Sequence, residues 1–423
     1  MRRISSYKYF GCLKSCSSKS HAQRILILGA LSKSDLFIEH LFESEVGSDV
    51  KNVMNVFRKL GYTFSETQFG TTLSAPIPFA LPTHTTFSIG ESGFALRALS
   101  TVLSIFTDEY TIEGHKTILS RNHEGLIDSL RSVGFNVDSN KNGLPIKISR
   151  SQNIKSIINI DGSGGSQFIS GLLMLSPFLK SSTEIRISNL TSRPYIEMTI
   201  AVLEEFNCEI ISKTESIFQI NGNQQIGVDK IALEGDWSNM AFHFAGAALS
   251  GEVSVSGLHL NSTQADKVVL EVLNMFGAKI EADFTGEIKV SCAFRNPFQI
   301  DLTDAPDLFP VLSVLACGAK GVSTLNGTHR LINKESNRLV SICEMLDVFG
   351  VQYRIENDSL SIIGTASVNG GKVKTYNDHR IAMAAICAAT ISSSDIIIDN
   401  EECIQKSYRN YFVHMNEILN YES

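Results

Sequence analysis

The sequence predicts an α/β protein built from six copies of one β-α-β-α-β-β unit. Three observations lead to this prediction: two series of helices alternate along the chain, each series recurs at steps of 69 to 73 residues, and strand-like runs lie between the helices. Self-similarity at a fixed period indicates the architecture of a whole chain, which a single motif cannot do.

The first series consists of amphipathic helices that end in Gly or Asn before a strand-like run. Gly and Asn suit this position because helices commonly end through a residue with a left-handed backbone. Successive helix-stop residues are 73, 73, 70, 73 and 70 residues apart, and they are Gly61, Gly134, Asn207, Gly277, Gly350 and Asn420. Each stop marks one predicted unit.

The second series consists of helices that are rich in small apolar residues. They begin near residues 20, 93, 166, 238, 307 and 378. Because they are apolar on nearly every side, we expect them to be buried and closely packed. Strand-like runs such as EVSVSGL, KIEADF, EIKVSC and FQIDL complete the unit.

The sixth unit lacks its last strands in this sequence. Residues 4–10, ISSYKYF, form the strand-like segment that no unit claims. We therefore expect residues 4–10 to pair with strands of the C-terminal half, which makes that domain discontinuous.

Composition and charge exclude several classes of function. The 423 residues are 43% hydrophobic and 19% charged, and the net charge is −7, which argues against a nucleic-acid coat or a general membrane-surface role. The start of the chain lacks the apolar stretch and cleavage site of a secretory signal, and the most apolar segments are too short to span a bilayer. None of the eight cysteines forms a CxxC pair, so we expect reduced thiols, a cytoplasmic location and no metal site.

Polar and charged residues collect at the N-termini of the buried helices. A helix N-terminus offers unpaired N–H groups and a positive dipole end, which suit phosphate or carboxylate. A simple helix cap is the better interpretation of GDWS at 235–238, but capping does not explain the cations. Buried cations without anions are very costly, so these residues predict one or two anionic substrates. The cations are Lys19, Arg24, Arg97, Arg121, Arg193, Lys334, Arg338, Arg380 and Lys406.

These stretches, in this order and spacing, resemble the 5-enolpyruvylshikimate-3-phosphate synthase family of enolpyruvyl transferases. The resemblance runs over nearly the whole chain. It rests on SSKSHAQR at 17–24, Gly93 with Arg97, Arg121, Ser166-Gln167, SRPYIEMT at 192–199, APD at 305–307, KESNR at 334–338, NDHRIAM at 377–383 and Lys406.

The resemblance implies two domains of three β-α-β-α-β-β units each, with buried parallel helices that point to an interdomain cleft. The N-terminal domain would comprise residues 17–233. The discontinuous C-terminal domain would comprise residues 1–16 and 234–423.

The implied reaction transfers the enolpyruvyl group of phosphoenolpyruvate to the 5-hydroxyl of shikimate 3-phosphate and releases phosphate. It belongs to the shikimate pathway of aromatic amino-acid synthesis and needs no cofactor or metal. By resemblance, Asp307 accepts the proton of the hydroxyl group, Glu335 is the acid/base group for the methylene carbon, and Lys19 lies between the substrates. The residues implied for shikimate 3-phosphate are Lys19, Ser20, Arg24, Ser166, Gln167, Ser192, Tyr195, Asp307 and Lys334. Those implied for phosphoenolpyruvate are Lys19, Gly93, Arg121, Gln167, Arg338, Arg380 and Lys406. The implied partners are these small molecules alone, with no nucleic acid or membrane, and the chain should be a monomer.

The stretch NKESNR at 333–338 has two interpretations. By itself it reads as the solvated first turn of a helix, with Glu335 favoured by the helix dipole. Within the resemblance, Glu335 becomes an acid/base group, and Lys334 and Arg338 each hold one substrate. The whole constellation favours the second interpretation.

The chain departs from the family pattern at several positions. Glu91-Ser92-Gly93-Phe94 stands where Asn-Ala-Gly-Thr is usual, Gly165 replaces a serine, Asn122 replaces a proline and Asn337 replaces an aspartate. Glu91 should repel phosphoenolpyruvate and the inhibitor glyphosate, which both approach the Gly93 loop, unless Arg97 or Lys406 pairs with it or burial protonates it.

Three alternatives remain at this stage. The related UDP-N-acetylglucosamine enolpyruvyl transferase carries a reactive cysteine in its first-half domain, whereas no cysteine lies between Cys16 and Cys208 here. A degenerate, non-catalytic anion-binding paralogue would not need both Asp307 and Glu335. A scaffolding protein would not need the buried cations.

Overall fold

The computed structural model describes residues 1–76, 84–140, 143–150, 154–283 and 286–419. The chain forms two compact units: the N-unit, Lys19–Leu233, and the C-unit, which combines Met1–Ser18 with Glu234–Ser423. Residues 17 and 18, which the sequence placed in the N-terminal domain, group with the C-unit. The reason is local pairing, since Ser17 bridges Gly235 and the Ser18 N–H donates to the Glu234 carbonyl at 2.8 Å.

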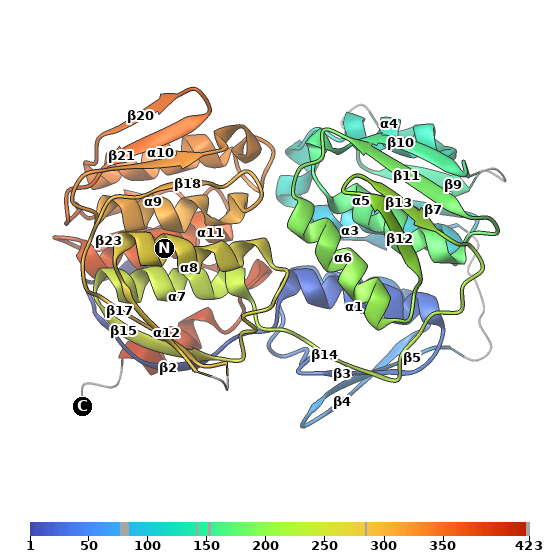
Figure 1. The fold of residues 1–423 in the computed structure, drawn as a ribbon, viewed down its shortest axis with the longest axis horizontal. Coiled ribbons are helices and arrows are strands. Elements are labelled where there is room, and N and C mark those ends of the chain that lie inside the picture. The colour runs from blue at the N-terminus through green and yellow to red at the C-terminus, as the bar shows by residue number, and fades with distance from the viewer. Residues whose placement is uncertain (77–83, 141–142, 151–153, 284–285, 420–423) are drawn as a thin grey trace. The chain divides into compact units, whose positions relative to one another are not determined.

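Within the described residues, the N-unit contains three four-stranded sheets. Strands such as β3, β7 and β11 can be followed in Figure 1. In each sheet one pair of neighbours is parallel and the other two pairs are antiparallel. The strands, in hydrogen-bonded order, are β14 (Lys230–Ala232), β3 (Leu36–Glu39), β5 (Gly70–Ser74) and β4 (Thr63–Thr67); β6 (Thr85–Ser88), β7 (Glu109–Glu113), β9 (Ile146–Arg150) and β8 (Phe135–Ser139); β10 (Ile157–Asp161), β11 (Thr183–Ser188), β13 (Ile217–Ile220) and β12 (Ile210–Thr214).

In the part of the N-unit that the structure describes, six α-helices accompany these sheets, and buried helices alternate with amphipathic ones. They are α1 (Lys19–Ser32), α2 (Ser48–Lys59), α3 (Gly93–Val102), α4 (Glu124–Val133), α5 (Gln167–Leu175) and α6 (Arg193–Glu205). The buried helices α1, α3 and α5 belong to the predicted second series, and the prediction of burial is confirmed. Close packing of α3 on α5 requires Gly171, because a Cβ atom there would lie 2.8 Å from the Ala98 Cα.

The C-unit repeats this plan with one sheet that is a strand shorter. Its strands, in hydrogen-bonded order, are β16 (Lys279–Ala282), β17 (Ile288–Ser291), β15 (Gly251–Ser256) and β2 (Tyr9–Lys14); β18 (Gln299–Asp301), β19 (Val322–Asn326), β21 (Ser359–Ile363) and β20 (Tyr353–Glu356); β1 (Arg2–Ile4), β23 (Ile396–Ile398) and β22 (Gly371–Val373). Its helices are α7 (Trp237–Leu249), α8 (Val269–Phe276), α9 (Phe309–Cys317), α10 (Arg338–Phe349), α11 (His379–Ala388) and α12 (Tyr411–Leu419).

The three inner helices of the C-unit are buried along their whole length. Every residue of α7, α9 and α11 is buried, and these helices pack on one another. The fold class is therefore confirmed: each unit contains three repeats with buried helices. Among the described residues, no helix is both long and apolar enough to cross a bilayer.

The N-terminal segment completes the C-unit, as the sequence predicted. Strand β2 lies parallel to β15, and β1 lies antiparallel to β23 in the last repeat. The single strand expected at 4–10 is instead two strands, 2–4 and 9–14, because the two parts join different sheets. A sheet of the N-unit is likewise completed by a strand that is distant in sequence. Strand β14 pairs with β3 immediately before the chain enters the C-unit.

The predicted helix-stop residues have the expected backbone conformation. Positive φ angles occur at Gly61 (93°), Gly134 (116°), Asn207 (62°), Gly277 (84°) and Gly350 (69°). Gly134, Gly277 and Gly350 are the C-caps of α4, α8 and α10, and Gly61 and Asn207 directly follow the C-caps of α2 and α6. The sixth predicted stop, Asn420, lies outside the described residues.

A buried aromatic cluster joins β2, α7 and α12. His243 of α7 is fully buried, its Nε2 lies 3.0 Å from the Tyr408 hydroxyl, and its ring stacks on Tyr411. Burial, reinforced by His414, lowers the pKa of His243 to about 3. The imidazole is therefore neutral in the folded protein at neutral pH.

We predict that His243 makes the protein sensitive to acid. The unfolded chain gains a proton at this histidine near pH 6.5, whereas the folded chain does so near pH 3, so stability is lost as pH falls between these values. In thermal unfolding, His243→Phe should show a shallower fall of Tm from pH 6.5 to 4. The exposed His259 gives the control His259→Gln, which should keep the wild-type slope; equal slopes in all three proteins would contradict the prediction.

Candidate active site

Gly93 begins α3 beside two arginines and a glutamine of the N-unit. A Cβ atom at this position would lie 3.2 Å from Nη1 of both Arg97 and Arg121 and 3.5 Å from Oε1 of Gln167. Only a hydrogen atom leaves the guanidinium groups undisturbed. The structure therefore brings together Gly93, Arg121 and Gln167, three of the residues implied for phosphoenolpyruvate.

Arg97 of this cluster is held by neutral groups. Nη1 of Arg97 donates to the Gly93 carbonyl at 3.2 Å and to Gln167 at 3.3 Å. Burial, reinforced by the charge of Arg121, lowers the pKa of Arg97 to about 10. Nε and Nη2 of Arg121 are buried and have no hydrogen-bond partner among the described residues. Such donors, next to a second cation, would be satisfied by an anion.

Lys19 and Arg24 extend from the first turns of α1. Lys19 Nζ lies 3.2 Å from Asp49 Oδ2 at the start of α2. Arg24 is 1% exposed and donates to the Thr199 hydroxyl at 2.8 Å and to the Tyr195 carbonyl at 3.1 Å. Burial lowers the pKa of Arg24 to about 10, because its hydrogen-bond partners are neutral.

The predicted serines of the N-unit lie at helix starts. Ser166 precedes α5 and Ser192 precedes α6, and both are buried. Neither hydroxyl caps the helix that follows, and Ser192 has a left-handed backbone with φ 55°. Ser20 offers its carbonyl to Arg24 Nη1 at 2.7 Å. Helix starts without a side-chain cap are suited to anions.

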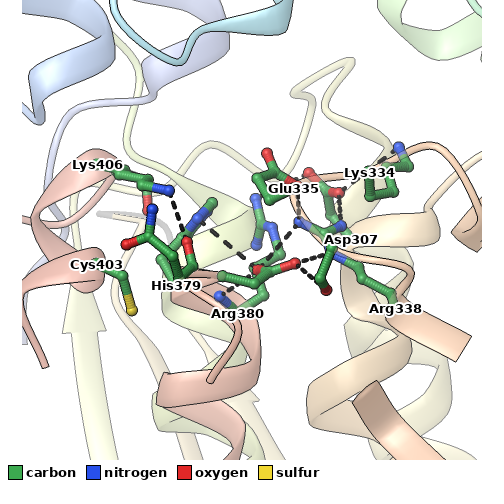
Figure 2. A network of polar contacts seen from close by, with 12 residues as sticks. Asp307, Lys334, Glu335, Arg338, His379, Arg380, Cys403 and Lys406 are labelled. Atoms are coloured by element: carbon green, nitrogen blue, oxygen red, sulfur yellow. Dashed lines mark hydrogen bonds and ion pairs between the residues drawn. The ribbon is translucent and has the colours of Figure 1, made fainter. Parts of the chain in front are cut away.

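In the C-unit, Arg338 stands at the centre of a carboxylate cluster (Figure 2). The side chain is fully buried, at 0% exposure. Its Nε donates to Asp378 at 2.8 Å, its Nη1 to Asp307 at 2.5 Å and its Nη2 to Glu335. The NKESNR segment is therefore not a solvated turn, because Arg338 and Glu335 take part in a partly buried network.

Asp307 is shared by three cations. Besides Arg338, its carboxylate meets Arg380 Nη2 at 2.9 Å and Lys334 Nζ at 3.9 Å. Burial opposes the charge on Asp307, but Arg380, Arg338 and Lys334 outweigh burial and hold its pKa well below the usual range. Burial lowers the pKa of Lys334 to about 8, and Asp307 opposes this shift.

Arg380 has a second support, which reaches it from α7. Its Nη2 donates to the Ser238 hydroxyl at 3.0 Å, and that hydroxyl donates to Asp266. Asp266 lies in the 3₁₀ turn Ala265–Val268 and is 2% exposed. Burial, reinforced by Asp307, raises the pKa of Asp266 to about 7.

Lys406 approaches the loop before α11. Its Nζ donates to the Asn377 carbonyl at 2.6 Å, and it is 7% exposed (Figure 2). Tyr376 and Asn377 both have left-handed backbones, with φ of 53° and 56°. Such strain persists only where the surroundings fix it, and it gathers at functional loops.

The sequence analysis missed the carboxylates that balance these cations. Asp49 faces Lys19, Asp378 faces Arg338, and Asp266 supports Arg380 through Ser238. A usable signal existed for Asp378, because an aspartate that precedes an apolar helix with an early arginine must be a buried cap. No comparable signal marks Asp266, which precedes an ordinary amphipathic helix.

Two expectations about surface and loop charges need correction. Glu91 accepts a hydrogen bond from the Thr117 hydroxyl at 2.6 Å and has Lys116 Nζ at 3.8 Å, so Lys116, which the sequence analysis did not name, is a cation that offsets it. Arg193 is half-exposed and pairs with Glu197 and Glu215, so it needs no substrate anion.

No group of three or more His, Cys, Asp or Glu side chains with metal-binding geometry occurs in the described part of the chain.

Comparison with known proteins decides the family. The profile of EPSP synthase (3-phosphoshikimate 1-carboxyvinyltransferase) matches residues 7–415. The chain belongs to the EPSP synthase family. The 3-phosphoshikimate 1-carboxyvinyltransferase of Methanocorpusculum labreanum is 33% identical over 98% of this chain and 97% of its own length, and that of Brachyspira hyodysenteriae is 32% identical over 98% of both chains.

Solved structures show that the EPSP synthase fold is shared. EPSP synthase from Acinetobacter baumannii superposes with a TM-score of 0.79 at 24% identity, covering 98% of this chain and 97% of that one. The enolpyruvyl transferase NikO from Streptomyces tendae reaches a TM-score of 0.76 at 13% identity, covering 98% and 96%. At these identities the likeness concerns the fold alone.

We predict that Arg338 is also a stability determinant of this EPSP synthase family member. Arg338→Met would leave three carboxylates without their shared cation, and breaking a buried ion pair costs about 3–5 kcal/mol. Arg354 gives a matched control, because its pair with Glu356 is exposed and worth at most about 1 kcal/mol. Calorimetric unfolding should therefore show a large Tm loss for Arg338→Met and little change for Arg354→Met; equal losses would contradict the prediction.

Proposed function

We propose that the protein transfers the enolpyruvyl group of phosphoenolpyruvate to the 5-hydroxyl of shikimate 3-phosphate and releases phosphate. One observation carries the proposal: a chain of the EPSP synthase family places buried cations around the carboxylates Asp307 and Glu335. The reaction needs proton transfer and the binding of several anionic groups, and this set of side chains offers both.

In this proposal, shikimate 3-phosphate is held mainly from the N-unit. Arg24 supplies a fixed, desolvated charge, and Ser166 stands at the start of α5, where its hydroxyl caps no helix N–H. The full set proposed for this substrate is Lys19, Ser20, Arg24, Ser166, Gln167, Ser192, Tyr195, Asp307 and Lys334.

The residues proposed for phosphoenolpyruvate include buried arginines whose donors have no acceptor in the described residues. The unpartnered Nε and Nη2 of Arg121 in the N-unit support this assignment. In the C-unit, Nε of Arg380 is likewise buried without a hydrogen-bond partner in the described residues. The full set proposed for this substrate is Lys19, Gly93, Arg121, Gln167, Arg338, Arg380 and Lys406.

Asp307 and Glu335 are the proposed acid/base pair, and Lys19 is the proposed third catalytic group. Arg380 and Arg338 depress the pKa of Asp307, which makes it a weak base. A substrate anion bound to the same arginines offsets their charge and raises the basicity of Asp307. The proton acceptor thus becomes effective only when the substrate is present.

The partners in this proposal are the two small-molecule substrates. We further propose a cytoplasmic monomer, in keeping with a net charge of −7 and cysteines without CxxC pairs. Size-exclusion chromatography with light scattering tests the monomer, and a dimer mass would overturn it.

The central test measures phosphate release from shikimate 3-phosphate plus phosphoenolpyruvate. We expect turnover with the wild type and none when UDP-N-acetylglucosamine replaces shikimate 3-phosphate. Glu335→Gln and Asp307→Asn keep side-chain size but cannot cycle a proton, so each should lower kcat by roughly 10²–10⁴. Calorimetric binding of shikimate 3-phosphate by Glu335→Gln confirms that the site is intact, and near-normal turnover in both variants would refute the mechanism.

The Glu91–Lys116 pair gives a second test. Lys116 offsets the carboxylate next to the phosphoenolpyruvate residues, although it is 75% exposed and therefore partly screened. Lys116→Gln should raise KM for phosphoenolpyruvate by about two- to fivefold, and Glu91→Gln/Lys116→Gln should return it to the wild-type value. Glu91→Gln alone should tighten phosphoenolpyruvate and glyphosate by less than about tenfold. If the double variant stays as weak as Lys116→Gln, Glu91 does not act on these anions.

A further inference from the structure

Arg380 is held by two supports of different origin. On one side its Nη2 meets Asp307 Oδ2 at 2.9 Å, a carboxylate already assigned to proton transfer. On the other side Nη2 donates to the Ser238 hydroxyl at 3.0 Å, and Nη1 lies 3.5 Å from the Ser238 carbonyl. If Asp307 accepts a proton from a substrate, its contact with Arg380 changes. The contact between Arg380 and Ser238 involves no group that is assigned to proton transfer.

The Ser238 hydroxyl has one proton to give. It donates that proton to the Asp266 carboxyl oxygen. The lone pairs of the hydroxyl are therefore left to accept from Arg380. A chain of two hydrogen bonds, from Arg380 through Ser238 to Asp266, fixes the direction in which the guanidinium points.

The surroundings of Asp266 disfavour the charged form of its carboxyl group. It is 2% exposed, and the charged groups that act on it are Asp307, Arg380, Asp236 and Lys334, two of which are like charges. Burial and Asp307 raise its pKa, so keeping the ionised form costs free energy.

The geometry points to a role for Asp266. We propose that Asp266 is a positioning residue for Arg380, that it acts through the Ser238 hydroxyl, and that it sets the affinity of the site for phosphoenolpyruvate. This inference rests on the proposed function, because it assigns Arg380 to that substrate. Asp266 itself touches no substrate and takes no part in proton transfer.

The variants Ser238→Ala and Asp266→Asn test the proposal by steady-state kinetics. Each should raise KM for phosphoenolpyruvate by about tenfold, the scale of one hydrogen bond to a charged group, while kcat and KM for shikimate 3-phosphate change by less than about twofold. Ser238→Thr restores the hydroxyl and should restore KM. Asp358 accepts a hydroxyl bond from Thr328 but is 44% exposed, so Asp358→Asn is the matched control and should behave as wild type.

Two double variants separate positioning from a general structural effect. Because both residues act along one path, Ser238→Ala/Asp266→Asn should be about as impaired as either single variant. In an Arg380→Lys background, Ser238→Ala should add less than about twofold, because the fork that it orients is gone. The proposal would be overturned if the double variant raised KM for phosphoenolpyruvate by about 100-fold, or if KM rose equally for both substrates. It would also be overturned if Ser238→Ala kept its full effect on KM in the Arg380→Lys background.

Calorimetric titration with inorganic phosphate distinguishes this inference from the proposed function. Ser238→Ala should weaken phosphate binding to the wild-type chain but not to the Arg380→Lys chain, with or without turnover. If the wild type forms no product yet phosphate shows this pattern, the proposed function fails and the positioning role stands. If turnover is normal and neither phosphate affinity nor KM responds to Ser238→Ala, the positioning role fails alone.

Discussion

The compensation of buried charge around Arg338 is the constraint on which the C-unit depends. One guanidinium that is 0% exposed satisfies Asp307, Glu335 and Asp378, which come from three different elements of the chain. Ions inside a protein are tolerated only with complete partners, so the start of α10, the turn before α9 and the cap of α11 are tied to one point. The residues proposed for chemistry are held in place by the same bonds that make their burial possible.

The N-unit resolves its buried charge in the opposite way. Arg24 and Arg97 are held by hydroxyl, amide and carbonyl groups, and burial lowers the pKa of both. Nε and Nη2 of Arg121 have no acceptor in the described residues. In the C-unit, Asp307, Glu335 and Asp378 neutralise the buried Arg338, whereas Arg24 and Arg97 of the N-unit are held by neutral groups and keep a charge that favours an external anion.

The architecture could be predicted from the repeat spacing of the sequence. Of the candidate site, the basic residues could be predicted but several of their partners could not. Steps of 69 to 73 residues and left-handed stops such as Gly134 and Gly350 follow from backbone rules that act locally, so they can be read from sequence. Basic residues in apolar surroundings were visible for the same reason. Their partners were not, because Asp266 reaches Arg380 only through Ser238, and Lys116 reaches Glu91 only through the fold of a loop. Pairing across distant segments depends on tertiary structure, and a single sequence contains no period that reports it.

The exchange of strands between the ends of the chain affects the order in which the protein can fold. Strands β1 and β2 are synthesised first, yet their partners β23 and β15 come from residues 396–398 and 251–256. The whole N-unit can form while these two strands wait with unpaired backbone groups, which is the state in which strands most easily add to the wrong neighbour. β2 can pair once β15 has left the ribosome, but β1 must wait until β23 has followed. During synthesis β1 and β2 are thus unpaired segments, and they join their sheets only after the whole N-unit has been made.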